Sequence, residues 1–469
     1  MQGRGGCHPR LRRGNLDRLK KSTLFYYSLA DLPIAMSLFP VAVFIPRFWT
    51  SDMGVPLTLL ATIGIAVRVF DVITDPLMGY ISDHPRSRFG RRKPWVLLAT
   101  PIMMLSIYML FLPPEGAGIV HYGIWSLGLS IAITMMLIPY YAWGAELSTD
   151  YNERSRVTGG RAMAGISGSL IAQLVPGAAL LIFGIGGSSV VLQLVGTTML
   201  ILMPVCVALA LWKVPEPENY SRTTVPVLKG LKLMWQNGPF KQLVMAFMIG
   251  SIGLAITTPL YLFFIADVLG AEDKAIYMLT FFYLSSFAAV PFWVWLAGKI
   301  GKHRAYLTAF FTLAFVHPFY MLLGEGDFWW MLPITLATGF ASGGFSATLP
   351  NSMKADVIDL DTLNSGENRA ALFFSSWSFA QKATSTIGGS LALFGLALFG
   401  FEPGAGAANG PDELFGVSFL FAVFPSLFYL IGAAIVWTYP ITEERQREIR
   451  AAIEAREREE AEAGLASSA

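Results

Sequence analysis

Residues 67–94 read VRVFDVITDPLMGYISDHPRSRFGRRKP, an apolar run that ends in a basic loop. The apolar half carries three ionisable residues, Arg68, Asp71 and Asp75. The four-residue spacing places Asp71 and Asp75 on one face of a helix, and Arg68 lies one turn before Asp71. Charged side chains are costly inside a lipid bilayer and usually mark the path of an ion or a substrate. The stretch therefore predicts a membrane-spanning helix with a charged functional face.

The composition of the whole chain also favours a membrane setting. Of 469 residues, 54% are hydrophobic and 14% are charged, whereas soluble domains carry about 25% charged residues. The net charge of +2 provides no basic field for nucleic acid, which we exclude as a partner. Cys7 and Cys206 have no motif spacing, so neither a disulfide nor a metal site is expected. The lipid bilayer is therefore the expected partner of most of the surface.

Apolar windows long enough to span a bilayer, about 20 residues, recur along the chain. The basic N-terminal tail, residues 1–23, precedes a window without a clear cleavage site, so we expect a retained first span. The prediction is an all-α integral membrane protein with 12 transmembrane helices. The windows are 24–47, 55–82, 94–113, 118–146, 158–183, 188–214, 240–268, 273–297, 304–324, 327–352, 370–400 and 413–439.

Basic residues predict the orientation and the division of these spans. Lys and Arg gather in alternate short loops, which places those loops and both termini on the cytoplasmic side of an inner membrane. The long charged connection 215–239 divides the spans six and six. RFGRRKP follows the second span and KIGKHR the eighth, as expected for parallel six-helix halves of a major facilitator fold. We expect bundles at 24–214 and 240–439, and a charged cytoplasmic tail at 440–469.

The carboxylate pair needs relief from mutual repulsion by a proton, a bound cation or nearby positive side chains. Two carboxylates and the hydroxyl of Thr74 suit Na⁺, whereas a proton needs only one carboxylate with a raised pKa. The sequence does not choose between the two ions. The alternative is that Arg68 merely neutralises Asp71 at a helix contact. The sequence contains no P-loop, catalytic triad or zinc motif, so we expect neither an enzyme nor a cofactor.

Three segments carry a family resemblance: DVITDPLMGYISDHPRSRFGRRKPW (71–95), IPYYAWGAELSTDYNERSRVTGGR (138–161) and ADVIDLDTLNSGENRAALFFSSWSFAQK (355–382). They resemble the signatures of the glycoside–pentoside–hexuronide:cation symporters, the melibiose-permease-like branch of the major facilitators. The resemblance implies a secondary transporter that couples Na⁺ or H⁺ entry to uptake of a sugar, glycoside or uronic acid by alternating access. Fold-level analogy implies a functional monomer.

The resemblance also assigns residues to sites. It implies a cation site at Asp71, Thr74, Asp75 and Thr134, with Lys382 of the eleventh span close by. Where the branch has two acids that grip sugar hydroxyls, this sequence has Ala35 and Leu137, so the substrate should be less polar or bring its own charge. The substrate-binding set that we expect is Asp31, Tyr140, Tyr141, Arg161, Trp377 and Lys382.

The eleventh span carries a polar stripe on one helical face, formed by Ser375, Ser378, Lys382 and Ser385. Tight helix packing explains small residues there as well as a cavity does, but a lysine needs water or a carboxylate partner. We therefore expect the stripe to face a hydrated cavity. The hypothesis is that Lys382, together with Arg68, couples the two halves by responding to the occupancy of the carboxylate pair.

Charged loops on the predicted cytoplasmic side suggest a gate. Ion pairs between loops of the two halves would close this side when the transporter faces outward, although such loops are also often merely solvated. The expected gate and loop-motif residues are Asp83, Arg88, Arg91, Arg92, Glu153, Arg154, Arg156, Asp356, Asp359 and Arg369.

Two other functions compete with sugar transport. The same fold carrying an amphiphile, such as a lysolipid, is favoured by the missing sugar-gripping acids. A non-transporting sensor or membrane enzyme is the least expected, because the spans contain no catalytic constellation.

Overall fold

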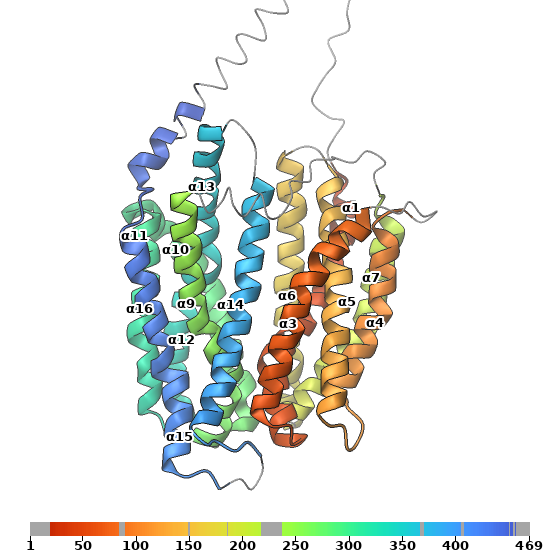
Figure 1. Ribbon diagram of the computed structural model, residues 1–469, viewed down its shortest axis with the longest axis vertical. Helices are drawn as coiled ribbons and strands as arrows, with labels where there is room; N and C mark the ends of the chain where they lie inside the picture. The colour runs from red at the N-terminus through yellow and green to blue at the C-terminus, as the bar shows by residue number, and fades with distance from the viewer. Residues whose placement is uncertain are drawn as a thin grey trace, which may run out of the picture.

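The computed structural model of the chain describes residues 19–83, 90–148, 151–184, 186–216, 237–365, 370–404, 408–449, 451–453 and 455. These residues form long helices that run along one axis of the molecule (Figure 1). Helix α1 (Lys21–Leu29), near the first described residues, lies at the end of the molecule that also carries α13 (Leu349–Ser365). We call this the α13 end. The opposite end carries α15 (Pro411–Ser418) and is called the α15 end.

Among the described residues, the first half of the chain forms seven α-helices and one π-helical turn, separated by short connections. The elements are α1 (Lys21–Leu29), α2 (Asp31–Arg47), η1 (Phe48–Asp52), α3 (Leu57–Asp83), α4 (Lys93–Phe111), α5 (Ile119–Glu146), α6 (Tyr151–Phe183) and α7 (Ser188–Lys213).

The second half begins after residues 217–236, which lie outside the described ranges. Several of its spans are interrupted by 3₁₀ or π-helical turns. Its elements are α9 (Gly238–Phe263), η2 (Phe264–Val268), η3 (Glu272–Lys274), α10 (Ala275–Ile300), α11 (Lys302–Val316), η4 (His317–Leu322), η5 (Phe328–Trp330), α12 (Met331–Ser342), η6 (Gly343–Thr348), α13, α14 (Ala370–Leu398), α15, η7 (Phe419–Val423) and α16 (Phe424–Trp437).

The predicted spans are helical where the structure describes them. Ten helical segments among the described residues are long and apolar enough to cross a membrane, and they coincide with ten of the twelve predicted windows. The other two windows, 327–352 and 370–400, correspond to the broken helix from η5 to the start of α13 and to α14. Helix α14 carries serine, threonine and lysine among its apolar residues. The prediction of an all-α membrane protein is confirmed.

The similarity between the basic loops before α4 and α11 extends to the conformation of one glycine in each. Gly90 lies just before α4, with φ +104°, and Gly301 just before α11, with φ +86°. Glycine adopts this left-handed region without the steric cost that a Cβ imposes. Gly90 and Gly301 therefore share the left-handed backbone conformation shortly before the next helix begins.

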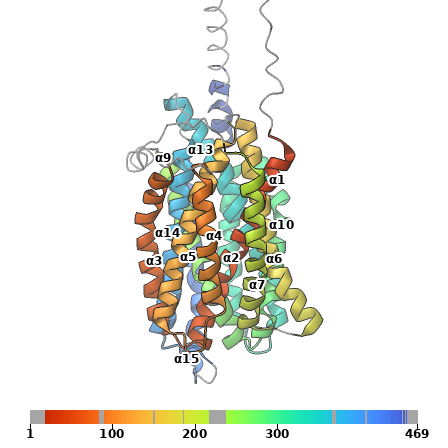
Figure 2. The same cartoon turned by 90° about the vertical axis from the view of Figure 1, so that its right-hand side faces the viewer.

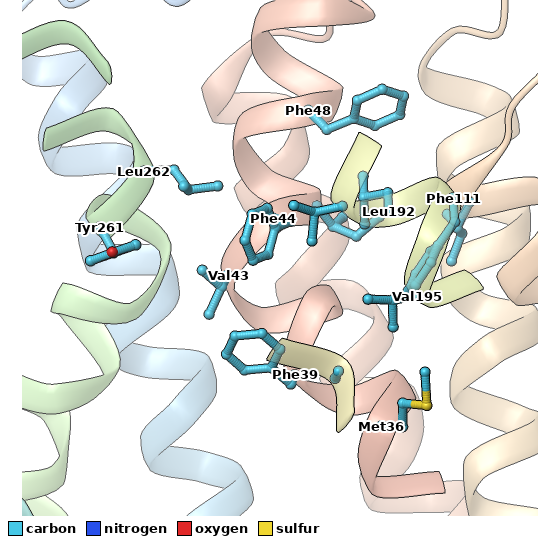
Figure 3. Close-up of a cluster of buried hydrophobic side chains, with 14 of the residues drawn as sticks. Met36, Phe39, Val43, Phe44, Phe48, Phe111, Leu192, Val195, Tyr261 and Leu262 are labelled. Atoms are coloured by element: carbon cyan, nitrogen blue, oxygen red, sulfur yellow. The ribbon is translucent and has the colours of Figure 1, made fainter. Parts of the chain in front are cut away.

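Helices up to α7 pack mainly with one another, and helices from α9 onward do the same. The two groups meet along two lateral seams, α3 against α14 and α6 against α10 (Figure 2). Between these seams α2 packs against both groups. Figure 3 shows its apolar side chains Met36, Phe39, Val43, Phe44 and Phe48 between Phe111, Leu192 and Val195 on one side and Tyr261 and Leu262 on the other.

Candidate functional site

Two carboxylates of α3 pair with two hydroxyls of α5. Ser130 donates its hydroxyl to Asp71 Oδ1, and Thr134 donates to Asp75 Oδ1 over 2.8 Å. Both pairs are separated by 59 positions, because the two helices run parallel and in register. The four-residue spacing on α3 therefore meets an equal spacing on α5. This ladder brings together three of the four predicted cation-site residues, Asp71, Asp75 and Thr134.

A positive side chain stands at each carboxylate. Arg68 Nη1 donates to Asp71 Oδ2 over 3.0 Å within α3. Lys382 Nζ donates to Asp75 Oδ2 from α14, across the seam between the two groups of helices. The expected proximity of Lys382 to the acidic pair is thus present, and it is directed at Asp75.

The two carboxylates differ in access to solvent. The side chain of Asp71 is 6% exposed, whereas that of Asp75 is 26% exposed and that of Lys382 is 41% exposed. Thr74 is half-buried beside them, and its hydroxyl donates to the Phe70 carbonyl over 3.1 Å. Its oxygen lone pairs remain as acceptors or ligands. Carboxylate and hydroxyl oxygens suit a hard monovalent cation or a proton.

A second cluster lies where α2, α5 and α6 meet. Arg161 stacks its guanidinium on the ring of Tyr141 at 3.7 Å and stands 4.0 Å from the carboxylate of Asp31. Tyr141 is 40% exposed and Asp31 is buried. Because Asp31 only approaches Arg161, the guanidinium retains donors for an anionic group of a ligand. The structure therefore brings Asp31, Tyr141 and Arg161 together as expected.

Tyr140 does not share this exposure. It is fully buried, and its hydroxyl donates to the Tyr27 carbonyl over 2.6 Å while Tyr27 donates to the Tyr140 carbonyl over 2.8 Å. The two rings stack at 4.6 Å. These contacts join α1 to α5, so the ring of Tyr140 is enclosed by protein and the expected substrate contact is not present in this conformation.

Trp377 also lies away from solvent. It is 4% exposed and packs against Phe247, with ring centroids 4.3 Å apart, and under the ammonium of Lys354 at 4.6 Å. It belongs to the apolar core of the second group of helices. The expected substrate contact at Trp377 is not present in this conformation, because its ring is enclosed by protein on α9 and α13.

The polar stripe of α14 is partly open, as the sequence indicates. Ser378 and Ser385 are exposed, and Ser385 donates to the carbonyl of Lys382 over 2.9 Å. The side chain of Ser375 lies outside the described residues. The stripe thus surrounds Lys382 with small residues on an accessible helix face.

Ion pairs at the α13 end link residues of the same group of helices wherever both partners are described. Arg91 and Arg92 both bind Glu146, and Arg92 also donates to Ser82 over 2.8 Å. Further pairs join Arg156 to Glu153 at 2.6 Å and Lys302 to Asp356 at 2.7 Å. Asp359 lies on α13. Arg88, Arg369 and the side chains of Asp83 and Arg154 lie outside the described residues, so the proposed pairing between loops stays a prediction.

The α15 end is closed by charges that the sequence did not single out. Arg47 is 7% exposed and binds Asp267 and, at 3.5 Å, Glu272. Ser188 donates to the same Glu272. These contacts tie α2 and α7 to the ends of α9 and α10. The molecule is therefore held shut at the α15 end by pairs that cross between the groups.

Two functional residues that were not predicted, Ser130 and Arg47, nevertheless have a recognisable signal in the sequence. Ser130 precedes Thr134 by four positions, the same spacing that relates Asp71 to Asp75. Arg47 is a lone base at the end of an apolar window whose neighbouring loops are acidic. Neither signal names a partner, because partners come from helices distant in the sequence.

Comparisons with known proteins match nearly the whole chain. A family described as MFS/sugar transport protein matches residues 26–443. A sodium-dependent lysophosphatidylcholine symporter 1 of Gallus gallus is 25% identical, covering 96% of this chain and 92% of the relative. A glucuronide carrier protein homolog of Escherichia coli K12 is 24% identical, covering 94% and 97%.

A solved structure also matches. It is a bacterial homolog of the human lysosomal transporter Spinster, with a TM-score of 0.61 and 14% identity, covering 92% of this chain and 97% of that one. This likeness concerns the fold, and the major facilitator fold expected from the sequence is confirmed.

Proposed function

We propose, because this chain belongs to the MFS/sugar transport protein family, that it is a symporter in which a monovalent cation drives uptake of an organic substrate that bears an anionic group. Family membership makes the chain a multi-pass secondary transporter and not an enzyme. The coupling ion, Na⁺ or H⁺, and the substrate are parts of the proposal.

One observation carries the cation coupling: Asp75 is bound at the same time by Thr134 of α5 and by Lys382 of α14. A cation at Asp75 competes with the Lys382 ammonium for the same carboxylate. Removing Lys382 from Asp75 loosens the contact between the two groups of helices. Occupancy and conformation are therefore linked, and the coupling is reciprocal by thermodynamic necessity.

The proposed alternating access relies on the division of the chain into two groups of helices. We propose that residues 24–214 and 240–439 rock as two bundles joined by the linker 215–239, with the α13 end in the cytoplasm. The Arg47 contacts then close the outer side, so this conformation faces inward. We further propose that the transporter works as a monomer in an inner membrane.

The substrate proposal rests on Arg161, Tyr141 and Lys382. A guanidinium stacked on an exposed tyrosine suits a carboxylate or phosphate on a flat or apolar body. The two relatives named above carry, by their printed names, a glucuronide and a lysophosphatidylcholine. The first bears a carboxylate and the second a phosphate, so both fit this chemistry. We place a sugar acid, or a glycoside that carries an acid group, first.

A lysolipid is the second candidate. Ala35 and Leu137 offer no acceptor for sugar hydroxyls beside the Arg161 cluster. An apolar tail tolerates such a surface better than a polyhydroxylated ring does.

The test is uptake by the purified protein in liposomes, with an imposed Na⁺ or H⁺ gradient. The probes are an aryl glucuronide, its neutral glucoside, a lysophosphatidylcholine and a neutral monoacylglycerol. We expect gradient-dependent uptake of one of the two probes that bear a carboxylate or phosphate, and little uptake of its counterpart without that group. Uptake that ignores both gradients would defeat the symport mechanism, and equal uptake of charged and neutral partners would defeat the role of Arg161.

A further inference from the structure

We propose that a cavity between α11 and the C-terminal segment binds an anionic phosphate group, carried by a phospholipid headgroup or by a free organic phosphate. The cavity has a volume of about 290 Å³ and lies at the α13 end. Its walls come mainly from α10, the start of α11, α13 and the segment that follows α16. All of these belong to the second group of helices, so the site is separate from the Arg161 cluster and goes beyond the proposed transport.

The first argument compares the two halves of the chain. Similar basic loops precede α4 and α11, and each contains a glycine with positive φ. Helix α7 ends within WKVPE (212–216) and α16 ends within WTYPI (437–441), with tryptophan and proline at the same spacing. The start of α11 therefore corresponds to the start of α4, and Ile441 corresponds to Glu216.

The acceptor at this position differs between the halves. The carboxylate of Glu216 accepts from the backbone N–H groups of Arg91 and Arg92, both at 2.6 Å. Ile441 has no acceptor in its side chain, is 6% exposed and packs in the apolar core of the second group. Gly301 gives α11 no side-chain cap within the described residues. The start of α11 therefore keeps free donors and the positive end of the helix dipole, which attract anions.

The cavity lies at this uncapped helix start. Lys302, the first residue of α11, and Ile441 both line the cavity, so it takes the place that the Glu216 carboxylate takes beside α4. Its volume is close to the lower limit of ligand pockets, about 300 Å³, and therefore suits a small headgroup. A phosphate has enough oxygens to accept from backbone N–H groups and from an ammonium at the same time.

The charges beside the cavity favour an anion. Lys302 donates to both carboxylate oxygens of Asp356 at 2.7 Å, as Arg91 binds Glu146 in the first half. One of the three ammonium protons of Lys302 stays available. Arg304, in the first turn of α11, is exposed and has no acidic partner among the described residues. An anion would balance this surplus positive charge.

The polar wall of the cavity also has unused donors. Ser352 lines it with a hydroxyl. Tyr439 is 5% exposed, and its hydroxyl has no hydrogen-bond partner within the described part of the chain. The carboxylate of Asp356, which lines the cavity, is close enough to act on this hydroxyl electrostatically. The second acid in the lining, Glu443, is bound by Arg447, so it leaves the anion unopposed.

The outer face of α10 connects the cavity to the lipid surface. Val294 lines the cavity and is 58% exposed, and the neighbouring Trp295 is 52% exposed. The ammonium of Lys299 stands 4.4 Å from the centre of the Trp295 ring. Exposed tryptophan beside a basic residue is typical of the boundary between bilayer and water. A headgroup can therefore enter from the bilayer while its acyl chains stay along α10.

The experiment measures thermal unfolding of the purified full chain in a neutral detergent at constant ionic strength. The titrants are phosphatidylglycerol, phosphatidylcholine and glycerol 3-phosphate. We expect saturable stabilisation by phosphatidylglycerol alone, which assigns the site to a lipid headgroup, or by glycerol 3-phosphate as well, which assigns it to phosphate in general. No stabilisation by either, or equal stabilisation by phosphatidylcholine, would overturn the proposal.

Ile441→Glu is the decisive variant, because it supplies the carboxylate that Glu216 supplies in the first half. We expect it to lose the response, whereas Ile441→Gln, of the same size without the charge, should keep the midpoint of the titration within about threefold of wild type. Ser352→Phe, which fills the cavity, should also lose the response. Arg161→Gln should keep it, which separates this site from the proposed substrate site.

Equal responses of Ile441→Glu and Ile441→Gln would overturn the proposal, as would loss of the response in Arg161→Gln. If the Ile441 variants do not fold, Ser352→Phe and Arg304→Gln decide. Arg304→Gln should raise the midpoint at least threefold. Arg445→Gln is its matched control, because Arg445 is exposed in the C-terminal segment and is already bound by Glu448 at 2.7 Å.

Discussion

Several charged side chains of this protein lie partly or fully away from water, and each depends on the partner that balances its charge. An unpaired charge in a low-dielectric interior is costly, and a paired one is tolerated. Asp71, Asp75 and Lys382 each have an opposite charge within the described structure. Arg161 has a ring under it and a carboxylate that only approaches it. In the first arrangement each charge is balanced by a protein partner, whereas the second leaves room for a ligand's charge.

Arg161→Gln should weaken binding of the anionic substrate at least tenfold, about 1.4 kcal/mol, because the amide has no charge to offer. The cation midpoint should not change, since Asp75 lies in a different cluster. Substrate and Na⁺ titrations of the purified protein measure the two effects. Tyr140→Phe is a control that changes the neighbouring residue and removes a structural hydrogen bond instead. Unchanged substrate binding by Arg161→Gln would contradict the assignment.

Lys354 gives a pH effect on stability. It lies on α13 beyond the predicted span, and burial lowers its pKa to about 8. The unfolded chain holds the proton more tightly, so folding releases protons between pH 8 and the ordinary lysine pKa. Stability should therefore rise with pH across this window, by up to about 3 kcal/mol.

Lys354→Met should flatten that rise, as measured by thermal unfolding in detergent over a pH series. Lys299→Met is the matched control, because Lys299 is exposed and lies over the Trp295 ring. A wild-type profile that is flat above pH 8 would contradict the prediction.

At the scale of elements, helix ends are fixed by contacts between segments distant in the sequence. Glu216, just after α7, accepts from the backbone N–H groups of Arg91 and Arg92, both at 2.6 Å. A carboxylate suits the positive end of a helix, here α4. Gly90 makes the approach feasible: a Cβ there would lie 1.9 Å from Glu216 Oε2. The start of the linker 215–239 is thereby bound to the basic loop that precedes α4.

Glu216→Gln should lower the thermal stability by about 1–2 kcal/mol, because the helix loses a charged cap. Gly90→Ala should act in the same direction, since it adds both a clash and an unfavourable φ. Differential scanning fluorimetry measures both, with the exposed Glu115→Gln as the control. Equal stability of Glu216→Gln and wild type would show that the cap contributes nothing.

At the scale of the whole molecule, the position of the ion pairs sets the conformation. Pairs between the two groups of helices are found at the α15 end and at the central Asp75–Lys382 contact, whereas described pairs at the α13 end stay within one group. Opening the α15 end requires Arg47 to leave Asp267 and Glu272. The equilibrium between the two states should therefore depend on this one arginine.

Arg47→Gln should open the α15 end more often. Ala275, 2% exposed at the start of α10, reports this when replaced by cysteine in a background without Cys7 and Cys206. We expect a membrane-impermeant maleimide to label Ala275→Cys several-fold faster when Arg47→Gln is added. Arg47→Lys, which keeps a charge, should have a smaller effect. Equal labelling rates with and without the Arg47→Gln substitution would refute the lock.

Periodicity and composition alone determined the spans, the membrane class and the presence of charged faces, because hydrophobic length and helical spacing are local properties of a chain. They placed Asp71 and Asp75 on one face and Lys382 on a polar stripe. Only the tertiary structure decided which charges meet. It paired Asp75 with Lys382 and Asp71 with Ser130, closed one end through Arg47, and enclosed Tyr140 and Trp377 in protein. The reason is that helix rotation and register come from packing between helices far apart in the sequence, and no spacing rule along one helix specifies them.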